Sequence, residues 1–503
     1  MSDENNKNNN TEKETEILSE HDYSEQARIR REKLAELIEN GNNPYIITKY
    51  EVDANTKQIV ENFDELDGKD VKIAGRLMSR RNMGKANFIN IADFYGNIQS
   101  YVRLDDVGEE KYAQFKKWDI GDIIGINGKV FKTKTGEVSI HAYGIDLLSK
   151  SLIPLPEKFH GLKDTDIRYR QRYLDIIMNV ELKDMFVKKQ IFWNTVRNFM
   201  SEKGFLEVET PVLEVTSGGA AATPFKTHHN ALDIDVFLRI SMGELWQKKL
   251  LVAGFDKTFE IGRQFRNEGM SNEHLQDYTQ MEFYWAYADC RDGMKLVQEL
   301  YRKVTKEVMG GSKFISHGFE IDMDGEWVLY DFEEIIKSKL GIGIYDASIE
   351  QLKAKLNELN VAYDPKLNFW RLVDILWKVV RKDLSGPGFL IGQPVQLNPL
   401  PKRLKDDPRK ADQIQIIIAG SEMGNGYSEL NDPLDLEKRF REQRTMGEAG
   451  DTEAHNHDQE FIDALNYGMP PAFGFGVSER LFSYMMDKPM RECVLFPLMK
   501  PKD

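Results

Sequence analysis

Hydrophobic and polar residues alternate in short runs over residues 68–150, which predicts a domain built of β-strands. Turns that contain glycine, such as TKTGE, separate the runs VKIAGRLMS, ANFINIAD, GNIQSYVRL, GDIIGINGKVF and GEVSIHAY. Five short strands in about 80 residues are typical of a small barrel of the oligonucleotide/oligosaccharide-binding (OB) type, although other small all-β domains share the pattern.

Helical spacing of apolar residues dominates the rest of the chain. An N-terminal helix is predicted over 23–40, and an amphipathic helix over 184–203 that ends at Gly204. The segment GFLEVETPVL then reads as a strand broken at Pro211. Further helices are predicted at 291–308, 331–340, 348–359 and 369–383, and further strands at 388–396 and 413–419.

These patterns divide the chain into five parts. The Asn-rich, acidic start is predicted to be a disordered tail, and two prolines mark a linker after the β-rich domain. The parts are a tail at 1–22, a helical extension at 23–67, the barrel at 68–150, a linker at 151–180 and an α+β domain at 181–503. Within the last, residues 310–412 suggest no chemistry of their own.

Composition narrows the class of protein. The 503 residues are 41% hydrophobic and 30% charged, as expected for a globular protein of two or three domains. The sequence has no apolar run long enough for a membrane span and no secretory signal, so we expect a cytoplasmic location and no membrane partner. Two cysteines, Cys290 and Cys493, suggest reduced thiols rather than a disulfide framework.

The net charge of −14 argues against binding nucleic acid by bulk electrostatics, and no DNA partner is expected. One basic stretch exists at 71–92, which carries five Lys or Arg residues and no acidic one. Phe88, in the same stretch, could stack on an unpaired base. An acidic protein with one basic face could bind a single RNA in one orientation.

The most informative segment is FEIGRQFRNEGMSNEHLQDYTQMEFY, at 259–284. Arg266 and Glu268 are two residues apart, which predicts that they share one face of a strand, as do Gln280, Glu282 and Tyr284 on a second strand. A polar loop with His274 joins the two strands into an antiparallel hairpin with a charged surface. An Arg beside a carboxylate suits ATP, although the local pattern alone also fits a solvated face or an ion pair.

This segment resembles motif 2 of the class II aminoacyl-tRNA synthetases, and the wider chain resembles the bacterial-type lysyl-tRNA synthetases from about residue 23 to 502. The helix at 184–203 with Pro211 resembles motif 1, the dimer interface, and AFGFGVSERLFSYMM resembles motif 3. The resemblance implies an OB-fold anticodon-binding barrel followed by a class II catalytic domain with a mixed, mainly antiparallel sheet. It also implies a homodimer that joins L-lysine to tRNA(Lys) in an ATP- and Mg²⁺-dependent reaction.

The resemblance assigns roles to individual residues. Arg266 contacts the α-phosphate and the substrate carboxylate, Glu268 the adenine amino group and His274 the outer phosphates, while Tyr278 and Arg480 sandwich the adenine ring. Arg266 and Arg480 are the expected catalytic residues. The resemblance places lysine among Gly219, Glu244, Arg266, Glu282, Tyr284, Asn425 and Glu429, the metal at Glu422, Glu429 and Gln415, and the anticodon at Arg81, Phe88, Gln99 and Glu137.

A cluster of carboxylates would repel one another unless a cation sits among them, which favours lysine over aspartate or asparagine. Some positions depart from the family pattern. Gln415 replaces a magnesium carboxylate, Leu275 and Gln280 replace Asn and Met, and the motif 3 glycine series is one residue shorter, with Ser478 near its end. A catalytically weakened tRNA-binding paralogue is therefore the alternative hypothesis. A ligase acting on protein is disfavoured because such relatives lack the barrel.

Overall fold

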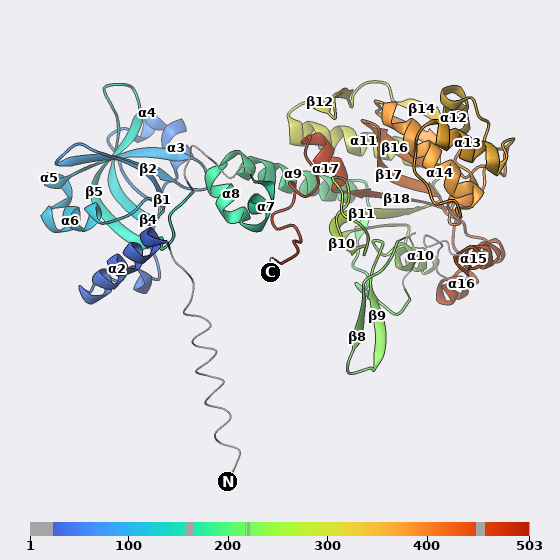
Figure 1. The fold of residues 1–503 in the computed structure, drawn as a ribbon, viewed down its shortest axis with the longest axis horizontal. Coiled ribbons are helices and arrows are strands. Elements are labelled where there is room, and N and C mark those ends of the chain that lie inside the picture. Colours follow the sequence, from blue (N-terminus) through green and yellow to red (C-terminus); the bar gives the residue numbers. More distant parts are fainter. Residues whose placement is uncertain (1–23, 157–163, 217, 219–221, 449–457, 502–503) are drawn as a thin grey trace, which may run out of the picture. The chain divides into compact units, whose positions relative to one another are not determined.

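The computed structural model describes residues 24–156, 164–216, 218, 222–448 and 458–501. The chain forms two compact units, Met1–Lys183 and Asp184–Asp503 (Figure 1). The predicted tail at 1–22 lies outside the described residues. Among the described residues, no helix is both long enough and apolar enough to span a bilayer.

The first unit contains a closed barrel with the strand order β1-β2-β3-β5-β4, which confirms the OB-type prediction. Its strands are β1 (Asp70–Asn82), β2 (Ala86–Ala92), β3 (Asn97–Arg103), β4 (Ile123–Lys132) and β5 (Val138–Ser149). Alternation is strict in β2 and β3, where every second side chain is buried in the barrel. The interior is filled by branched side chains such as Ile73, Leu77, Ile91 and Ile126, each at most 1% exposed.

Short helices accompany the barrel. They are α2 (Glu25–Glu39), α3 (Thr56–Glu61), α4 (Phe63–Leu66), α5 (Leu104–Val107), α6 (Glu109–Lys116), α7 (Thr165–Arg170) and α8 (Arg172–Met178), with a 3₁₀ turn at Pro44–Ile46. Helix α2 is capped by Ser24, the residue before it, whose hydroxyl accepts a hydrogen bond from the Ala27 amide. The predicted linker therefore contains two helices, α7 and α8.

The second unit is built on an eight-stranded sheet with the order β14-β15-β16-β17-β18-β11-β10-β6. Its strands are β6 (Leu206–Glu207), β10 (Lys257–Phe265), β11 (Asp277–Ala286), β14 (Val328–Asp331), β15 (Gly388–Ile391), β16 (Gln413–Ile418), β17 (Ser421–Ser428) and β18 (Ala472–Ser478). Most neighbours are antiparallel, and β10–β6 and β14–β15 are parallel. The mixed, mainly antiparallel sheet is as predicted.

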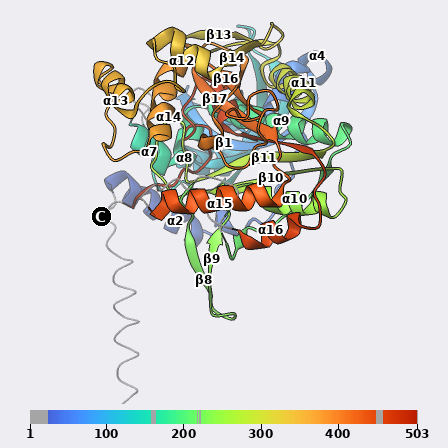
Figure 2. The same ribbon diagram turned by 90° about the vertical axis from the view of Figure 1, so that its right-hand side faces the viewer.

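Smaller sheets and helices surround this sheet (Figures 1 and 2). The small sheets are β7 (Leu213–Glu214) with β8 (Lys226–His229) and β9 (Ile234–Leu238), and β12 (Lys313–Ser316) with β13 (Phe319–Asp322). The helices are α9 (Glu181–Glu202), α10 (Glu244–Val252), α11 (Cys290–Met309), α12 (Phe332–Leu340), α13 (Ile349–Glu358), α14 (Phe369–Val380), α15 (Pro433–Glu448), α16 (Gln459–Leu465) and α17 (Arg480–Met485).

Alternation along β11 separates the two faces of the sheet. Met281 and Phe283 are fully buried, and the Phe283 ring packs against Phe473 and Phe475. A Cβ on Gly293 of α11 would collide with the Phe473 ring at 2.3 Å, so α11 packs closely on this face. Gln280, Glu282 and Tyr284 therefore point to the opposite face, which carries the site described below.

The predicted helices are confirmed, including the capping box of Ser348 and Gln351 at the start of α13. The strand predicted over 388–396 is too long. It ends at Ile391 because Gly392 adopts a positive φ of 73° and a 3₁₀ turn follows at Val395–Leu397. The broken strand around Pro211 is present as the two short strands β6 and β7.

Candidate functional site

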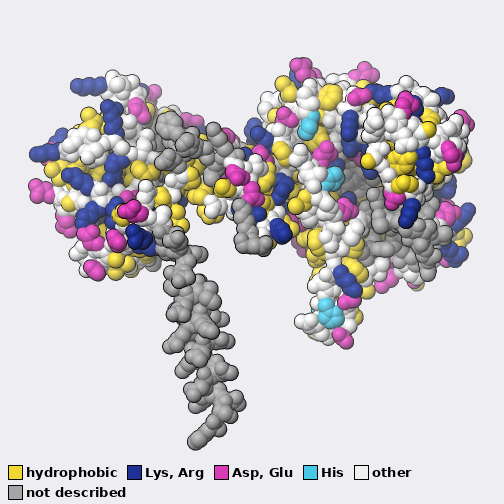
Figure 3. Space-filling model, in the orientation of Figure 1, with side chains coloured by type: hydrophobic (Ala, Val, Ile, Leu, Met, Phe, Trp, Pro, Cys, Tyr) yellow, Lys and Arg dark blue, Asp and Glu magenta, His cyan; other side chains and the backbone are white. Residues whose placement is uncertain are grey.

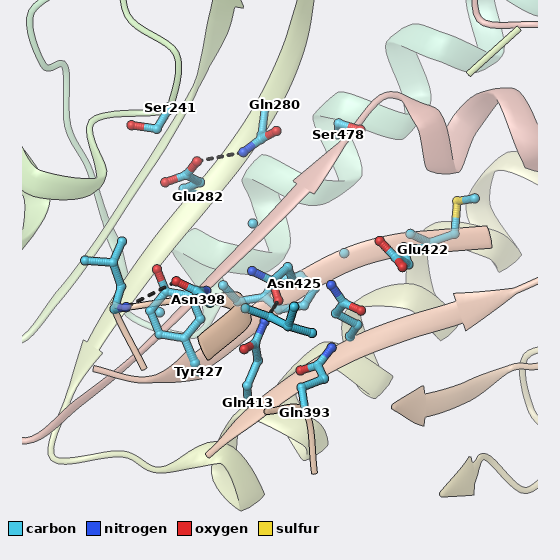
Figure 4. Close-up of a pocket in the computed structure, with 18 of the residues that line it drawn as sticks. Ser241, Gln280, Glu282, Gln393, Asn398, Gln413, Glu422, Asn425, Tyr427 and Ser478 are labelled. Atoms are coloured by element: carbon cyan, nitrogen blue, oxygen red, sulfur yellow. Dashed lines mark hydrogen bonds between the residues drawn. The ribbon is translucent and has the colours of Figure 1, made fainter. Parts of the chain in front are cut away.

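A cavity of about 760 Å³ opens on the polar face of the large sheet (Figure 4). Side chains from β11, β16, β17 and β18, from α10 and from α14 line it. Every described residue that the family resemblance assigned to the nucleotide, the amino acid or the metal lies on its wall. They are Glu244, Arg266, Glu268, His274, Tyr278, Glu282, Tyr284, Gln415, Glu422, Asn425, Glu429 and Arg480. Gly219 lies outside the described residues.

The antiparallel β10–β11 hairpin is present as predicted, but Arg266 and Glu268 do not share a strand. Strand β10 ends at Phe265, and Arg266 continues the pairing by only one bond, from its amide to the Gln276 carbonyl at 2.7 Å. The next amide, Asn267, instead donates to the Thr223 carbonyl at 2.8 Å, which draws the chain away from β11. Glu268 therefore reaches the cavity from the loop rather than from the strand.

Arg266 is held at the cavity wall by few contacts. Its Nε donates to the Ile240 carbonyl at 3.3 Å, and its guanidinium lies 6.0 Å from the centre of the Tyr278 ring. A planar guanidinium with several remaining donors is suited to a carboxylate or phosphate group. This arrangement leaves Arg266 able to bind an anionic ligand beside an aromatic surface.

Arg480 connects its own helix, α17, to two other segments of the cavity wall, near Arg266. Its Nε donates to the Glu273 carbonyl at 3.2 Å and its Nη1 to the Glu422 carbonyl at 3.4 Å. His274, next to Glu273, shares a 2.7 Å hydrogen bond with the Ser271 hydroxyl. Burial, together with nearby Arg480, lowers the pKa of His274, which is therefore neutral near pH 7.

The other end of the cavity is an acidic pocket formed by Glu244, Glu282 and Glu429, which are 6%, 6% and 1% exposed. Glu282 accepts hydrogen bonds from the Met242 amide at 3.1 Å, from Gln280 Nε2 at 2.6 Å and from the Tyr284 hydroxyl at 3.0 Å. Gln280 is one of the departures from the family pattern, and here it orients Glu282.

A residue that the sequence analysis missed, Lys248, lies within this acidic pocket. Its ammonium is 2.7 Å from Glu244 Oε1 and 2.6 Å from Glu429 Oε2, and the side chain is 2% exposed. Tyr427 was also missed, and its hydroxyl donates to Glu244 Oε1 at 2.5 Å. The i,i+4 spacing of Glu244 and Lys248 in GELWQKK was the available sequence signal.

One internal ammonium does not neutralise three carboxylates. Burial raises the pKa of Glu282 to about 7 and that of Glu429 to about 8, with the repulsion from Glu244 acting in the same direction. The pKa values of Tyr284 and Tyr427 are raised well above 10 by burial, so both hydroxyls remain donors. The pocket is therefore suited to a ligand that brings positive charge.

This arrangement makes the stability of the ligand-free protein depend on pH. The folded state keeps protons on Glu282 and Glu429 that the unfolded chain releases near pH 4.5, so stability falls as pH rises through their folded pKa values. We expect the melting temperature to fall by roughly 2–4 °C between about pH 6.5 and about pH 9. Thermal unfolding of the wild type and of Glu429→Gln at a series of pH values measures this dependence. The slope should be shallower in the variant, and equal slopes would contradict the assignment.

The predicted metal ligands are only partly brought together. Glu422 lies near the start of β17 and Glu429 directly after its end, so seven steps of largely extended chain separate their Cα atoms by roughly 20 Å. Figure 4 shows Glu422 and Tyr427 correspondingly far apart. Glu429 cannot share an ion with Glu422, and the prediction is corrected in this respect. Among the described residues, no group of three or more His, Cys, Asp or Glu side chains could hold a metal.

Gln415 and Glu422 both line the cavity from adjacent strands, β16 and β17. One carboxylate and one amide are too few to bind Mg²⁺ by themselves. They suit a Mg²⁺ ion that is also coordinated by the phosphates of a bound nucleotide. The Glu422 carboxylate accepts a 2.9 Å hydrogen bond from the Trp377 indole of α14, and Arg381 lies 3.7 Å from it. Residues 310–412 thus contribute to the site after all, through α14.

The remaining departures from the family pattern have structural roles. Leu275 is buried and packs with Tyr278, Met490 and Val494, so it supports one wall of the cavity. Ser478 ends β18, and its hydroxyl accepts a 3.3 Å hydrogen bond from the Arg480 amide.

The barrel carries a second candidate site on its outer face. Strand pairing places Arg81 opposite Phe88, Phe88 opposite Tyr101, and Tyr101 opposite His141. The ring centres of Phe88 and Tyr101 are 4.8 Å apart, and those of Tyr101 and His141 are 5.4 Å apart. Sequence analysis found Phe88 but missed Tyr101 and His141, which only the pairing across strands reveals.

The two other predicted residues of the barrel site lie next to this aromatic row. Gln99 precedes Tyr101 by two positions on the same face of β3, and its amide donates to Glu137 at 3.0 Å. Figure 3 shows basic side chains spread over the surface of the barrel, interspersed with acidic ones. The outer face thus combines stacking surfaces, an amide and Arg81, a combination that suits an unpaired nucleic-acid strand.

Comparison with known proteins points in the same direction. Residues 164–500 match the family described as tRNA synthetases class II (D, K and N), and residues 71–148 match the OB-fold nucleic acid binding domain. The lysine–tRNA ligase of Pelotomaculum thermopropionicum is 46% identical over 490 residues, covering 96% of both chains. That of Thermoanaerobacter pseudethanolicus is 44% identical over 499 residues, 98% of both chains. That of Clostridium perfringens is 43% identical over 491 residues, 96% of this chain and 98% of the relative.

Proposed function

This chain belongs to the class II tRNA synthetases of the D, K and N group, and on that premise we propose that it is an ATP-dependent lysine–tRNA ligase. The observation that carries the choice of lysine is the buried acidic pocket of Glu244, Glu282 and Glu429 at one end of the cavity. Arg266 and Arg480 supply positive charge for ATP at the other end.

In the first step, a carboxylate oxygen of lysine attacks the α-phosphorus of ATP, and the bond from that phosphorus to the bridging oxygen breaks to release pyrophosphate. The protein need only align the reactants and stabilise the charge of the transition state. Arg266 would contact both the substrate carboxylate and the α-phosphate. In the second step, a ribose hydroxyl at the tRNA 3′ end attacks the lysyl carbonyl and AMP leaves.

The nucleotide would be held by the residues at the Arg480 end of the cavity. The adenine ring would lie between Tyr278 and Arg480, with Glu268 at its amino group and neutral His274 donating to the outer phosphates. Mg²⁺ bound with ATP would be held by Glu422 and Gln415 and would neutralise phosphate charge. Since Gln415 is uncharged, we expect a weaker metal contact than two carboxylates would give.

The lysine side chain would enter the acidic pocket. Its α-ammonium would pair with Glu244, and its ε-ammonium with Glu429 and Tyr284, while Asn425 completes the wall. Buried carboxylates left unpaired by an uncharged amino acid would cost several powers of ten in the specificity constant, kcat/KM. The proposal therefore predicts strict selection for a basic amino acid.

The decisive experiment is ATP–pyrophosphate exchange with each standard amino acid. Lysine should stimulate exchange, and asparagine and aspartate should not. Exchange absent with lysine, in a protein that still binds tRNA, would instead establish the weakened paralogue that Gln415 suggested. Stimulation by another amino acid would refute the assignment of the acidic pocket.

The barrel is proposed to bind the anticodon of tRNA(Lys), through Arg81, Phe88, Gln99 and Glu137. Phe88→Ala removes a stacking surface, worth roughly 1–3 kcal/mol per base, so the KM for tRNA should rise by roughly 5- to 100-fold. Lysine-dependent exchange should not change, because the variant is in the other unit. Steady-state aminoacylation measures the effect, with Phe94→Ala, an exposed aromatic in the same unit, as the control. An unchanged KM would remove Phe88 from the interface.

A homodimer is proposed on the resemblance to motif 1 and on exposed apolar side chains. The apolar face of α9, formed by Phe192, Val196, Phe199 and Met200, is buried in the core. Leu206, Val212, Leu213 and Val215 just after the helix are 42–68% exposed. Such a group of exposed apolar side chains is a candidate contact with a second copy.

A further inference from the structure

The ammonium of Lys248 is held in the acidic pocket as a ligand would be. It lies between carboxylates of α10 and the end of β17, and the rings of Tyr284, Tyr427 and Phe461 are centred 5.8, 5.4 and 5.8 Å from it. The pKa of Lys248 is raised, because the attraction of Glu244 and Glu429 outweighs the opposing effect of its burial. Lys248 is therefore a permanent cation of the pocket.

Lys248 uses only one oxygen of Glu429. Oε2 makes the 2.6 Å ion pair with the Lys248 ammonium. Oε1 is buried and accepts no hydrogen bond from any residue that the structure describes. A buried carboxylate oxygen without a donor is unfavourable, which makes Oε1 an available acceptor on the wall of the cavity.

The backbone beneath Glu429 leaves room for this oxygen. A Cβ added at Gly474 of β18 would lie 2.2 Å from Glu429 Oε1 and 2.6 Å from the Tyr284 ring. The absence of a side chain at Gly474 thus preserves the space that Oε1 and the Tyr284 ring occupy.

We propose that Lys248 is a positioning residue for lysine recognition: it holds Glu244 and one oxygen of Glu429, and so presents the other oxygen of Glu429 to the substrate ammonium. This inference rests on the proposed function, since it concerns the lysine pocket. It also gives the charges a simple balance. When Glu244, Glu282 and Glu429 are all ionised, as they would be beside a bound cation, they and the Lys248 ammonium leave two negative charges, which match the α- and ε-ammonium groups of lysine.

Two substitutions test whether Lys248 positions Glu429 or only compensates its charge. Lys248→Met removes the cation, so the two carboxylates lose their common partner and the KM for lysine should rise about tenfold or more. Lys248→Arg keeps the charge, but its planar fork of five donors reaches both oxygens of Glu429, and the KM for lysine should again rise about tenfold. In both, the KM for ATP and the kcat at saturating lysine should stay within about threefold of the wild type.

Lys249→Met is the matched control, because it removes the neighbouring cation of the same helix, which contacts only the exposed Glu460, at 3.4 Å, among the described acidic residues. Its kinetics should equal those of the wild type. Thermal unfolding identifies variants that fail to fold, and if Lys248→Met does not fold, Lys248→Arg decides the matter alone. If Lys248→Arg has the same KM for lysine as the wild type, then Lys248 only balances charge and does not position Glu429. A fall in kcat without a change in KM would also overturn the proposal.

The outcome is distinguishable from failure of the proposed function. A wild type without lysine-dependent exchange would refute the function itself. A wild type with normal exchange, together with unaffected Lys248 variants, would refute only the positioning role.

Discussion

Arg266→Ala should lower lysine-dependent pyrophosphate exchange by roughly a thousandfold, because it removes the residue proposed to contact both the substrate carboxylate and the α-phosphate. Among the described residues its guanidinium makes one long hydrogen bond, to the Ile240 carbonyl, and lies near the Tyr278 ring, so removing it costs little folding energy. The loss should appear mainly in kcat, since an interaction that strengthens in the transition state is removed.

A matched variant tests whether the effect is specific. Arg263→Ala removes another arginine of the same hairpin, two residues before the end of β10, where it pairs with exposed Asp277 at the surface. It should retain near wild-type exchange. Arg266→Ala should still bind tRNA as the wild type does, because the barrel belongs to the other unit. Near wild-type exchange by Arg266→Ala would exclude it from catalysis.

Local patterns predicted the elements that depend on local physics. Alternation over 68–150 predicted the barrel because side chains in its strands alternate between the interior and the surface. The same rule predicted that Gln280, Glu282 and Tyr284 share a face, and they line one cavity. The rule failed at Arg266 and Glu268, because a long-range hydrogen bond from Asn267 to Thr223 ends the strand there.

The rest of the site depends on contacts between distant parts of the chain. Trp377 meets Glu422 across 45 residues, and Tyr427 meets Glu244 across 183 residues, so neither pair has a local signal. Family resemblance placed Glu429 near lysine and also near the metal, and only the length of β17 separates these two roles. Sequence patterns together with the family resemblance therefore identified most chemical groups of the site, but not the residues that orient them.

The lysine pocket should be most sensitive to a single methyl group at Gly474. In Gly474→Ala, the new Cβ would lie 2.2 Å from Glu429 Oε1, far inside van der Waals contact. Neither neighbour can move freely, since Glu429 is ion-paired with Lys248 and Tyr284 is 3% exposed. Displacing a charged hydrogen-bonding group costs roughly 1.5–3 kcal/mol, so the KM for lysine should rise by roughly 10- to 100-fold.

Comparing the KM for lysine with the KM for ATP distinguishes a defect in the lysine pocket from a general distortion of β18. Gly311→Ala is a suitable control, because a Cβ there meets nothing within 4 Å, and its kinetics and melting temperature should be unchanged. In Gly474→Ala the KM for ATP should remain close to that of the wild type, because the residues expected to bind the nucleotide lie at the Arg480 end of the cavity. Equal losses for lysine and ATP would mean that the strand as a whole had shifted. An unchanged KM for lysine would mean that Glu429 does not meet the substrate through Oε1, because that oxygen cannot keep its place beside an alanine.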